Sequence, residues 1–204
     1  MIERTMTHLN SNNLVSIAIE TTGNNPRLHD ICFICVILLN NYIKPSTQIV
    51  PFYTAIQPFR PENIDPETAS VNPTKINNAM IHGVAPSLAA DRLEEWVKLL
   101  DMPEGKRIVP IVHSWERVHS FLREWLGPHN CKHLISEEAR DLRTAALYLN
   151  DCLNQHAKPM MYTKVHPSFI GQAHNIQWLV HADIMEKALK QAEIYRLMLG
   201  ISNS

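Results

Sequence analysis

Hydrophobic and polar positions divide the chain into three successive strands followed by a mixture of helices and strands. Apolar and β-branched residues dominate Leu14–Glu20, Asp30–Leu39 and a segment within Gln48–Gln57, which predicts three strands. The run Asp30–Leu39 is apolar without alternation, which is typical of a strand covered on both faces. The proline-rich, polar segment Pro58–Pro66 predicts an extended connection.

The second part of the chain has mainly helical periodicity. In Ser87–Leu100, for example, the apolar residues recur at spacings that place them on one helical face. Helices are predicted at Pro73–Ile81, Ser87–Leu100, Trp115–Leu126, Glu137–Leu153 and Ala182–Leu199. Strands are predicted at Arg107–Val112 and Lys132–Ile135. Strands first and a mixture of helices and strands afterwards indicate an α/β domain.

Composition limits the class of protein. The chain has 204 residues, of which 45% are hydrophobic and 19% charged, as expected of one globular domain. We expect residues 1–13 to form a polar leader and residues 14–200 a single domain. No apolar run approaches the roughly 20 residues of a membrane span. The leader is too polar for a signal peptide, so a cytoplasmic protein without a membrane partner is predicted, and four cysteines fit a reducing compartment.

Charge argues against a strongly basic nucleic-acid binder. The 19 Lys and Arg residues are balanced by 20 Asp and Glu residues, which gives a formal net charge of −1. Non-specific affinity for nucleic acid comes mainly from clustered basic side chains that neutralise phosphates. The net charge is therefore more consistent with another protein as the partner than with a nucleic acid.

The end of the first predicted strand carries a recognisable motif. The segment Ala18–Gly23 reads Ala-Ile-Glu-Thr-Thr-Gly. It resembles the opening motif, Asp-x-Glu-Thr-Thr-Gly, of the DEDDh (DnaQ-like) 3′–5′ exonuclease family, with Ala18 at the place of the aspartate. Resemblance extends to Ile81–Val84 (Ile-His-Gly-Val), Ala139–Thr144 and Gln191–Tyr195. It implies the ribonuclease H-like α/β fold, a five-stranded mixed sheet with helices on both faces.

The resemblance also implies a reaction. Enzymes of this family remove nucleotides from a 3′ end with two divalent ions about 3.5–4 Å apart, held by four acidic residues. The family's second motif, His/Phe-Asn-x-x-Phe-Asp, matches His113–Val118 here, and Val118 stands at the place of the aspartate. Of the acids in these two motifs, only Glu20 is retained. A single carboxylate is expected to bind a metal ion only weakly.

The third motif, His-x-x-x-x-Asp on the last helix, can be placed in two registers. One register uses His181 as the general base and Glu186 as the acid. The other aligns Ala188 with the alanine that follows the family's aspartate. That register puts Lys187 at the metal position and Ala182 at the position of the base, and both registers remain open at this stage.

Two functions of different classes follow from the resemblance. The first is a degenerate exonuclease-like domain without two-metal catalysis, which binds another protein or a nucleic-acid 3′ end and needs no cofactor. The second is an active 3′–5′ exonuclease that uses Mg²⁺ or Mn²⁺ in a rearranged acidic site; its candidate residues are Glu20, Glu116, Asp141, Asp183 and Glu186. Remnant catalytic positions are Glu20, His181 and Glu186. Candidate nucleic-acid contacts are Thr21, Thr22, His113, Ser114 and Trp178. An unrelated nucleotide-binding or structural domain is a third reading, and the choice between DNA and RNA and the oligomeric state stay open.

Overall fold

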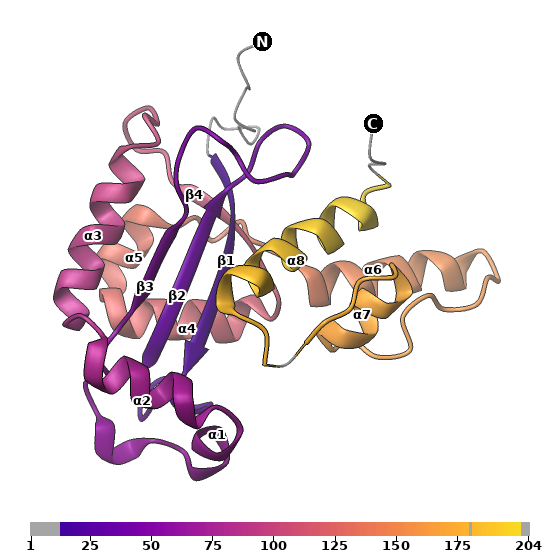
Figure 1. Ribbon diagram of the computed structural model, residues 1–204. Helices are drawn as coiled ribbons and strands as arrows, with labels where there is room; N and C mark the ends of the chain where they lie inside the picture. The colour runs from indigo at the N-terminus through magenta and orange to yellow at the C-terminus, as the bar shows by residue number, and fades with distance from the viewer. Residues whose placement is uncertain (1–12, 180, 201–204) are drawn as a thin grey trace.

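The computed structural model describes residues 13–179 and 181–200, and in this part of the chain five strands form one mixed sheet with helices on both faces (Figure 1). The strands are β1 (Asn13–Thr21), β2 (Ile31–Leu38), β3 (Phe52–Ala55), β4 (Ile108–Val112) and β5 (Arg140–Asp141). Their order in the sheet is β3-β2-β1-β4-β5. β1 is central, antiparallel to β2 and parallel to β4. This arrangement confirms the predicted fold class.

Helices pack on the sheet from both sides. They are η1 (Pro61–Asn63), α1 (Pro66–Val71), α2 (Pro73–His82), α3 (Pro86–Lys98), α4 (Trp115–Leu126), α5 (Pro128–Leu134), α6 (Leu142–Gln155), α7 (Pro167–Ala173) and α8 (Ile184–Met198). Buried side chains of α3, α4 and α5 form one core with the sheet, and those of α6, α7 and α8 form the second core. α8 lies across β1 and β2, which places it over the centre of the sheet (Figure 1).

β2 explains the apolar run without alternation in the sequence. All eight of its residues are buried. Side chains that point to the α3–α5 side are Ile34, Val36 and Leu38, and those on the other side include Phe33, Cys35 and Ile37. Full burial of one such side chain stabilises the fold by about 1.5–3 kcal/mol. Because both faces of β2 are covered, no polar face is left to alternate with the apolar one.

The register of β1 and β2 changes at the end of β1. Glu20 lies opposite Phe33, whereas Thr21 lies opposite Ile31, so the pairing is irregular between Glu20 and Thr21. An irregularity of this kind bends a strand and redirects the side chains beside it. It occurs within the Glu-Thr-Thr-Gly motif.

One predicted strand is wrong. Residues Lys132–Ile135 were expected as a strand, but most of this segment belongs to helix α5, and the fifth strand is Arg140–Asp141. Pro128 occupies the first turn of α5, where its missing N–H costs no hydrogen bond. Cys131 and Leu134, three residues apart, are both buried, which is the spacing of one helical face.

Other helix boundaries differ from the prediction because of capping. The helix expected from Glu137 begins at Leu142, since the side chain of Asp141 accepts a hydrogen bond from the backbone of Arg143. The last helix begins at Ile184 rather than Ala182, because Asp183 is its N-cap. Helices α1 and α7 were not predicted, since six or seven residues are too few for a clear helical period.

The remaining expectations about organisation concern the chain as a whole. The predicted polar leader, residues 1–13, lies outside the described residues except for Asn13, the first residue of β1. Among residues 13–179 and 181–200, no helix combines the length and apolar character needed to cross a membrane. A single domain over residues 14–200 stays a prediction.

The four cysteines are all in the reduced form. Cys32, Cys35 and Cys131 are buried, whereas Cys152 on α6 is partly exposed. Burial raises the pKa of the Cys32 and Cys35 thiols to about 12 and that of Cys131 to about 11. These three thiols therefore stay protonated at neutral pH.

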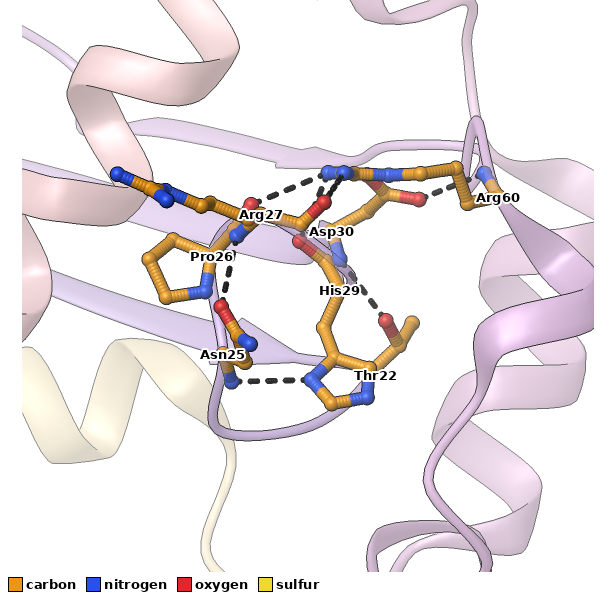
Figure 2. A network of polar contacts seen from close by, with 7 residues as sticks. All are labelled: Thr22, Asn25, Pro26, Arg27, His29, Asp30 and Arg60. Carbon is orange, nitrogen blue, oxygen red and sulfur yellow. Dashed lines mark hydrogen bonds and ion pairs between the residues drawn. The ribbon is translucent and has the colours of Figure 1, made fainter.

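The loop between β1 and β2 is fixed by one arginine (Figure 2). Nε and the backbone N–H of Arg60 donate to the two carboxylate oxygens of Asp30, at 3.0 and 2.7 Å. The backbone N–H of Asp30 donates to Oγ1 of Thr22 at 2.9 Å, which closes the base of the loop. The guanidinium also donates to the backbone carbonyl groups of Pro26, Arg27 and His29. Arg60 therefore holds the segment that follows the Glu-Thr-Thr-Gly motif against the chain before α1.

We expect Arg60→Met to lower the free energy of unfolding by about 2 kcal/mol, because the largely buried Asp30 carboxylate loses its charged partner. Urea denaturation measures this loss. Arg92→Met is the matched control, since Arg92 is exposed on α3 and its replacement is expected to cost less than about 0.5 kcal/mol. Equal effects of the two replacements would contradict a structural role for Arg60.

Candidate functional site at the end of β1

Two lysine side chains meet the carboxylate of Glu20. Nζ of Lys187 on α8 lies 2.5 Å from Oε1 of Glu20, and Nζ of Lys75 on α2 lies 3.2 Å from the same oxygen. The side chains of Glu20 and Lys187 are only 16% and 15% exposed. Nζ of Lys75 also donates to the backbone carbonyl of Ala182 at 2.8 Å. One carboxylate thus joins β1 to two helices that lie far apart in the sequence.

A third cation, Arg117, lies beside this ion cluster. Its guanidinium donates to Oγ1 of Thr21 at 3.0 Å, and its Cζ lies 5.6 Å from the centroid of the Phe121 ring. Oγ1 of Thr21 in turn donates to the carbonyl of Gly23 at 2.7 Å, which leaves its lone pairs for Arg117. Burial lowers the pKa of Arg117, whereas the charge of Glu20 opposes this change. We name Glu20, Lys75, Lys187 and Arg117 the cation cluster.

Hydrogen bonds between α8 and the sheet place Lys187. Oγ of Ser16 donates to the carbonyl of Ala188 at 2.7 Å. The buried side chain of Gln191 donates to the carbonyl of Ile17 at 2.9 Å and accepts from the N–H of His113 at 3.1 Å. Gln191 therefore ties α8 to both β1 and β4. This docking fixes the rotation of α8 so that Lys187 faces Glu20.

The other candidates of the third motif lie elsewhere on this helix. Glu186 pairs with Lys190 at 2.5 Å, and its side chain is 42% exposed. His181 is exposed in the turn before α8. Of the two sequence registers, the structure brings Lys187 to Glu20.

Apolar side chains occupy the two positions where the family's first two motifs have aspartate. Ala18 is 6% exposed and packs in the core on the α8 side of the sheet. Val118 is also 6% exposed and packs in the core on the α4 side. Neither side chain can bind a cation.

The residues after β4 form a separate network. Ser114 has a left-handed backbone, with φ of 62°, and its N–H donates to Asp141 at 2.9 Å. Nδ1 of His113 lies 3.0 Å from Oγ of Ser114, and Nε2 lies 2.7 Å from the carbonyl of Val165. Burial is the main cause that lowers the pKa of His113, so its ring is neutral at neutral pH. Both ring nitrogens are engaged within the protein.

The remaining candidate contacts have internal roles. Thr22 is completely buried, and its hydroxyl oxygen accepts from Asp30. Trp178 is partly buried against the core beneath α8. Thr21 differs, because it lines a pocket of about 250 Å³ at the end of β1. The lining residues of this pocket, named here the Glu20 pocket, are Ile19, Glu20, Thr21, Asn24, Asp65, Glu67, Thr68, Val71, Asn72 and Arg117.

The chain is similar to several solved structures. No protein-family model and no curated protein sequence matches the chain. Among solved structures, the nuclease domain of 3′hExo, a DEDDh family member bound to rAMP, has a TM-score of 0.63 and 16% identity, over 93% of this chain and 92% of that one. Cell-death related nuclease 4 has a TM-score of 0.68 and 13% identity, over 94% and 64%.

A third structure, E. coli exonuclease I with an oligonucleotide, has a TM-score of 0.66 and 15% identity, over 93% of this chain and 41% of that one. The chain has the fold of the DEDDh exonucleases. It spans less than two thirds of the last two proteins. The end of β1 carries the segment Ala18–Gly23, which resembles the family's opening motif, and residues of this segment line the Glu20 pocket.

The residues at this end of the exonuclease fold do not suit two divalent ions. Magnesium prefers oxygen ligands and needs several carboxylates to offset its charge. Within residues 13–179 and 181–200, no group of three or more His, Cys, Asp and Glu side chains can hold a metal ion. The Glu20 carboxylate already contacts two ammonium groups. A divalent ion that bound at Glu20 would have to displace these two lysines or be repelled by their charges.

Sequence reasoning missed two members of the cation cluster. Lys75 carried no signal, because nothing in its neighbourhood distinguishes it from a surface lysine. Arg117 carried one: it stands at the aromatic position of the second motif, directly before Val118. A motif that loses its acid and gains a cation beside it indicates a change in the charge of the site.

Proposed function

We propose that this chain is an exonuclease-fold protein without two-metal catalysis, which binds the 3′ end of a nucleic-acid strand in the Glu20 pocket. The observation that carries the proposal is the contact of 2.5 Å between Nζ of Lys187 and Oε1 of Glu20. A lysine of the chain itself thus forms an ion pair with the carboxylate on which a catalytic metal would depend.

Charge explains why hydrolysis is not expected. Two divalent ions bring four positive charges into the cleft, and the family offsets them with four acids. Two like unit charges about 4 Å apart repel by about 4 kcal/mol at an effective dielectric of 20. Lys75 and Lys187 would therefore oppose each ion, while Ala18 and Val118 offer no ligand.

Three of the acids named for a rearranged site have other partners. The carboxylate of Asp141 accepts from the N–H groups of Ser114 and Trp115, at 2.9 and 3.2 Å. Asp183 caps α8, and Glu186 pairs with Lys190. These contacts favour a binding role over an enzyme that uses Glu20 with these acids.

Binding of a nucleic-acid end is supported by the neighbouring structures rather than by an excess of positive charge. Three cations lie around Glu20 in the cation cluster, but Asp65 and Glu67 also line the pocket. Structures with the same fold hold rAMP in 3′hExo and an oligonucleotide in exonuclease I. These neighbours support a nucleic-acid ligand here.

The proposal predicts binding without cleavage. Labelled single-stranded DNA and RNA would be incubated with the purified chain and either Mg²⁺ or Mn²⁺, and both gel mobility of the products and fluorescence anisotropy would be recorded. We expect the fluorescence anisotropy to rise on binding. The strands should be cleaved no faster than in a buffer control without the protein.

Glu20→Gln is the control for cleavage, because it removes the retained carboxylate. Cleavage by the unmodified chain that disappears in Glu20→Gln would show that the enzyme reading is right. Absence of both cleavage and binding would contradict the nucleic-acid ligand and favour a protein partner.

A further inference from the structure

We infer that a second pocket, on the α3–α4 side of the sheet, binds an arginine side chain of a partner protein. This pocket, named here the Trp125 pocket, has a volume of about 330 Å³ and shares no residue with the Glu20 pocket. Its residues come from the start of β2, the segment after β3, the start of α3 and the last turns of α4. The inference goes beyond the proposed function, since it concerns another ligand at another place.

The Trp125 pocket has an apolar closed end and polar groups at its mouth. Ile31, Ile56 and Phe121 are buried and form the closed end. Gln57 and Glu124 are exposed and therefore lie at the mouth. Sites for organic ligands combine apolar walls with a few polar groups, and a volume of about 330 Å³ is at the lower end of their range of roughly 300–1,000 Å³. The pocket thus suits a small polar group on an apolar stem.

Glu124 provides an uncompensated carboxylate. Among residues 13–179 and 181–200, its side chain has no hydrogen bond and no ion pair. Glu124 lies in the last turn of α4, where the helix dipole has its negative end, so a carboxylate is unfavourable there. A cation bound beside Glu124 would be attracted by the carboxylate and by the helix end together.

Arg60 also lines this pocket, but it is already paired. Its Nη2 lies 2.8 Å from Oδ1 of Asp30 and donates to the backbone carbonyl groups of Pro26 and His29 (Figure 2). The charges of Arg60 and Asp30 therefore offset each other. With His29 counted as neutral, Glu124 leaves the lining with a formal charge of −1. This charge favours a monovalent cation over a phosphate or a neutral base.

The side chains beside Glu124 favour a guanidinium among cations. Trp125 follows Glu124 on α4, and its Nε1 donates to the carbonyl of Pro86 at 3.0 Å, so the ring rather than the N–H is left for a ligand. A guanidinium stacks on an aromatic ring and donates two parallel bonds to a carboxylate, whereas an ammonium is a point charge. The side-chain oxygen of Gln57, which has no partner among the described residues, is a further acceptor.

An exposed aromatic ring favours a protein as the source of the guanidinium. Phe59 lines the pocket and is nevertheless 79% exposed, so most of its ring lies outside. A free guanidinium compound inside the pocket would leave that ring in water. Residues on either side of an arginine in a protein would cover it, and aromatic residues are enriched in protein interfaces.

Titration of the isotope-labelled chain with acetyl-Gly-Arg-Gly-amide, followed by NMR at constant ionic strength, tests the inference. The chain has four tryptophans, and Trp125→Phe assigns the indole N–H signal of Trp125. The same peptide with citrulline is the neutral isostere, and the peptide with lysine keeps the charge without the fork. We expect the arginine peptide to shift the Trp125 signal and to bind about 10-fold more tightly than the citrulline peptide, with the lysine peptide between them.

Glu124→Gln should weaken binding of the arginine peptide about 10-fold and leave binding of the citrulline peptide unchanged. Glu104→Gln is the matched control, because Glu104 is also exposed and does not line the pocket. Acetyl-Leu-Arg-Leu-amide tests the protein partner. It should bind about 3-fold more tightly than the glycine-flanked peptide, and Phe59→Ala should remove this gain, because the apolar contact is lost.

Equal affinities for the arginine and citrulline peptides, or equal effects of Glu124→Gln and Glu104→Gln, would overturn the inference. Tighter binding of adenine than of the arginine peptide would overturn it in favour of a base site. A leucine-flanked peptide that binds no better than the glycine-flanked one would overturn the protein partner. These titrations contain no nucleic-acid strand, so their failure leaves the proposed function standing, and the failure of strand binding leaves the Trp125 pocket standing.

Discussion

Three acidic substitutions made together, Ala18→Asp, Val118→Asp and Lys187→Asp, are expected to give the chain a magnesium-dependent nuclease activity that the unmodified chain lacks. They restore three carboxylates at the positions that match the family's acids and remove the ammonium group 2.5 Å from Glu20. Two ions could then bind, activate water and stabilise the leaving oxygen. We expect cleavage at least about 100-fold above background, since single electrostatic groups in active sites contribute factors of about 10²–10³.

The restored activity should remain partial. A general base contributes a further factor of about 10²–10⁴, and the exposed His181 and the buried Ala182 offer none at the required place. The single substitutions are the controls, and each should stay inactive because it leaves too few ligands or leaves Lys187 in place. A folded triple variant that does not bind Mg²⁺ in calorimetry would contradict the placement of these three positions around one site.

Gly83→Ala is expected to lower the free energy of unfolding by about 3 kcal/mol. A Cβ atom at Gly83 would lie 2.3 Å from the carbonyl oxygen of Ala79 and 2.5 Å from the backbone N of Gln57. Both atoms belong to the backbone, so α2 and the end of β3 would have to separate. The expected loss therefore lies at the upper end of the roughly 1–3 kcal/mol that overpacking typically costs. The bond from the N–H of Gln57 to the carbonyl of Val84, 2.9 Å long, would be strained or lost.

Urea denaturation measures the effect, with Gly105→Ala as the control. Gly105 has φ of +76° and nothing within 4 Å of an added Cβ, so this replacement costs only the strain of a left-handed alanine, about 1 kcal/mol. If the two variants were equally stable, the close approach at Gly83 would not matter to folding.

The central part of the fold could be predicted because its signals are local. β2 is buried on both faces, and its apolar run is visible in the sequence without knowledge of its neighbours. The Glu-Thr-Thr-Gly motif fixed the end of β1 and, by resemblance, the order of the elements around it. Short elements gave no such signal: α5 has seven residues, and its burial depends on α4 rather than on its own periodicity.

The candidate site could be located but not described from the sequence. Glu20 was identified by its motif, whereas its partners lie 55 and 167 positions away, on helices whose rotation is set by tertiary contacts. Arg117 is 96 positions from Thr21. Pairing at such separations depends on how α2, α4 and α8 dock on the sheet. The hydrogen bond from Gln191 to Ile17 is one of the contacts that set the docking of α8, and no pattern in the sequence predicts that bond.

The burial of three cysteines has a practical consequence for measuring ligand binding. A maleimide dye reacts with thiolates, and protonated, buried thiols react slowly. Cys32, Cys35 and Cys131 are protected in this way, which leaves Cys152 on α6 as the accessible point of attachment. Helix α6 contributes no residue to the Glu20 pocket. The native chain therefore accepts a single fluorescent reporter without any engineered cysteine.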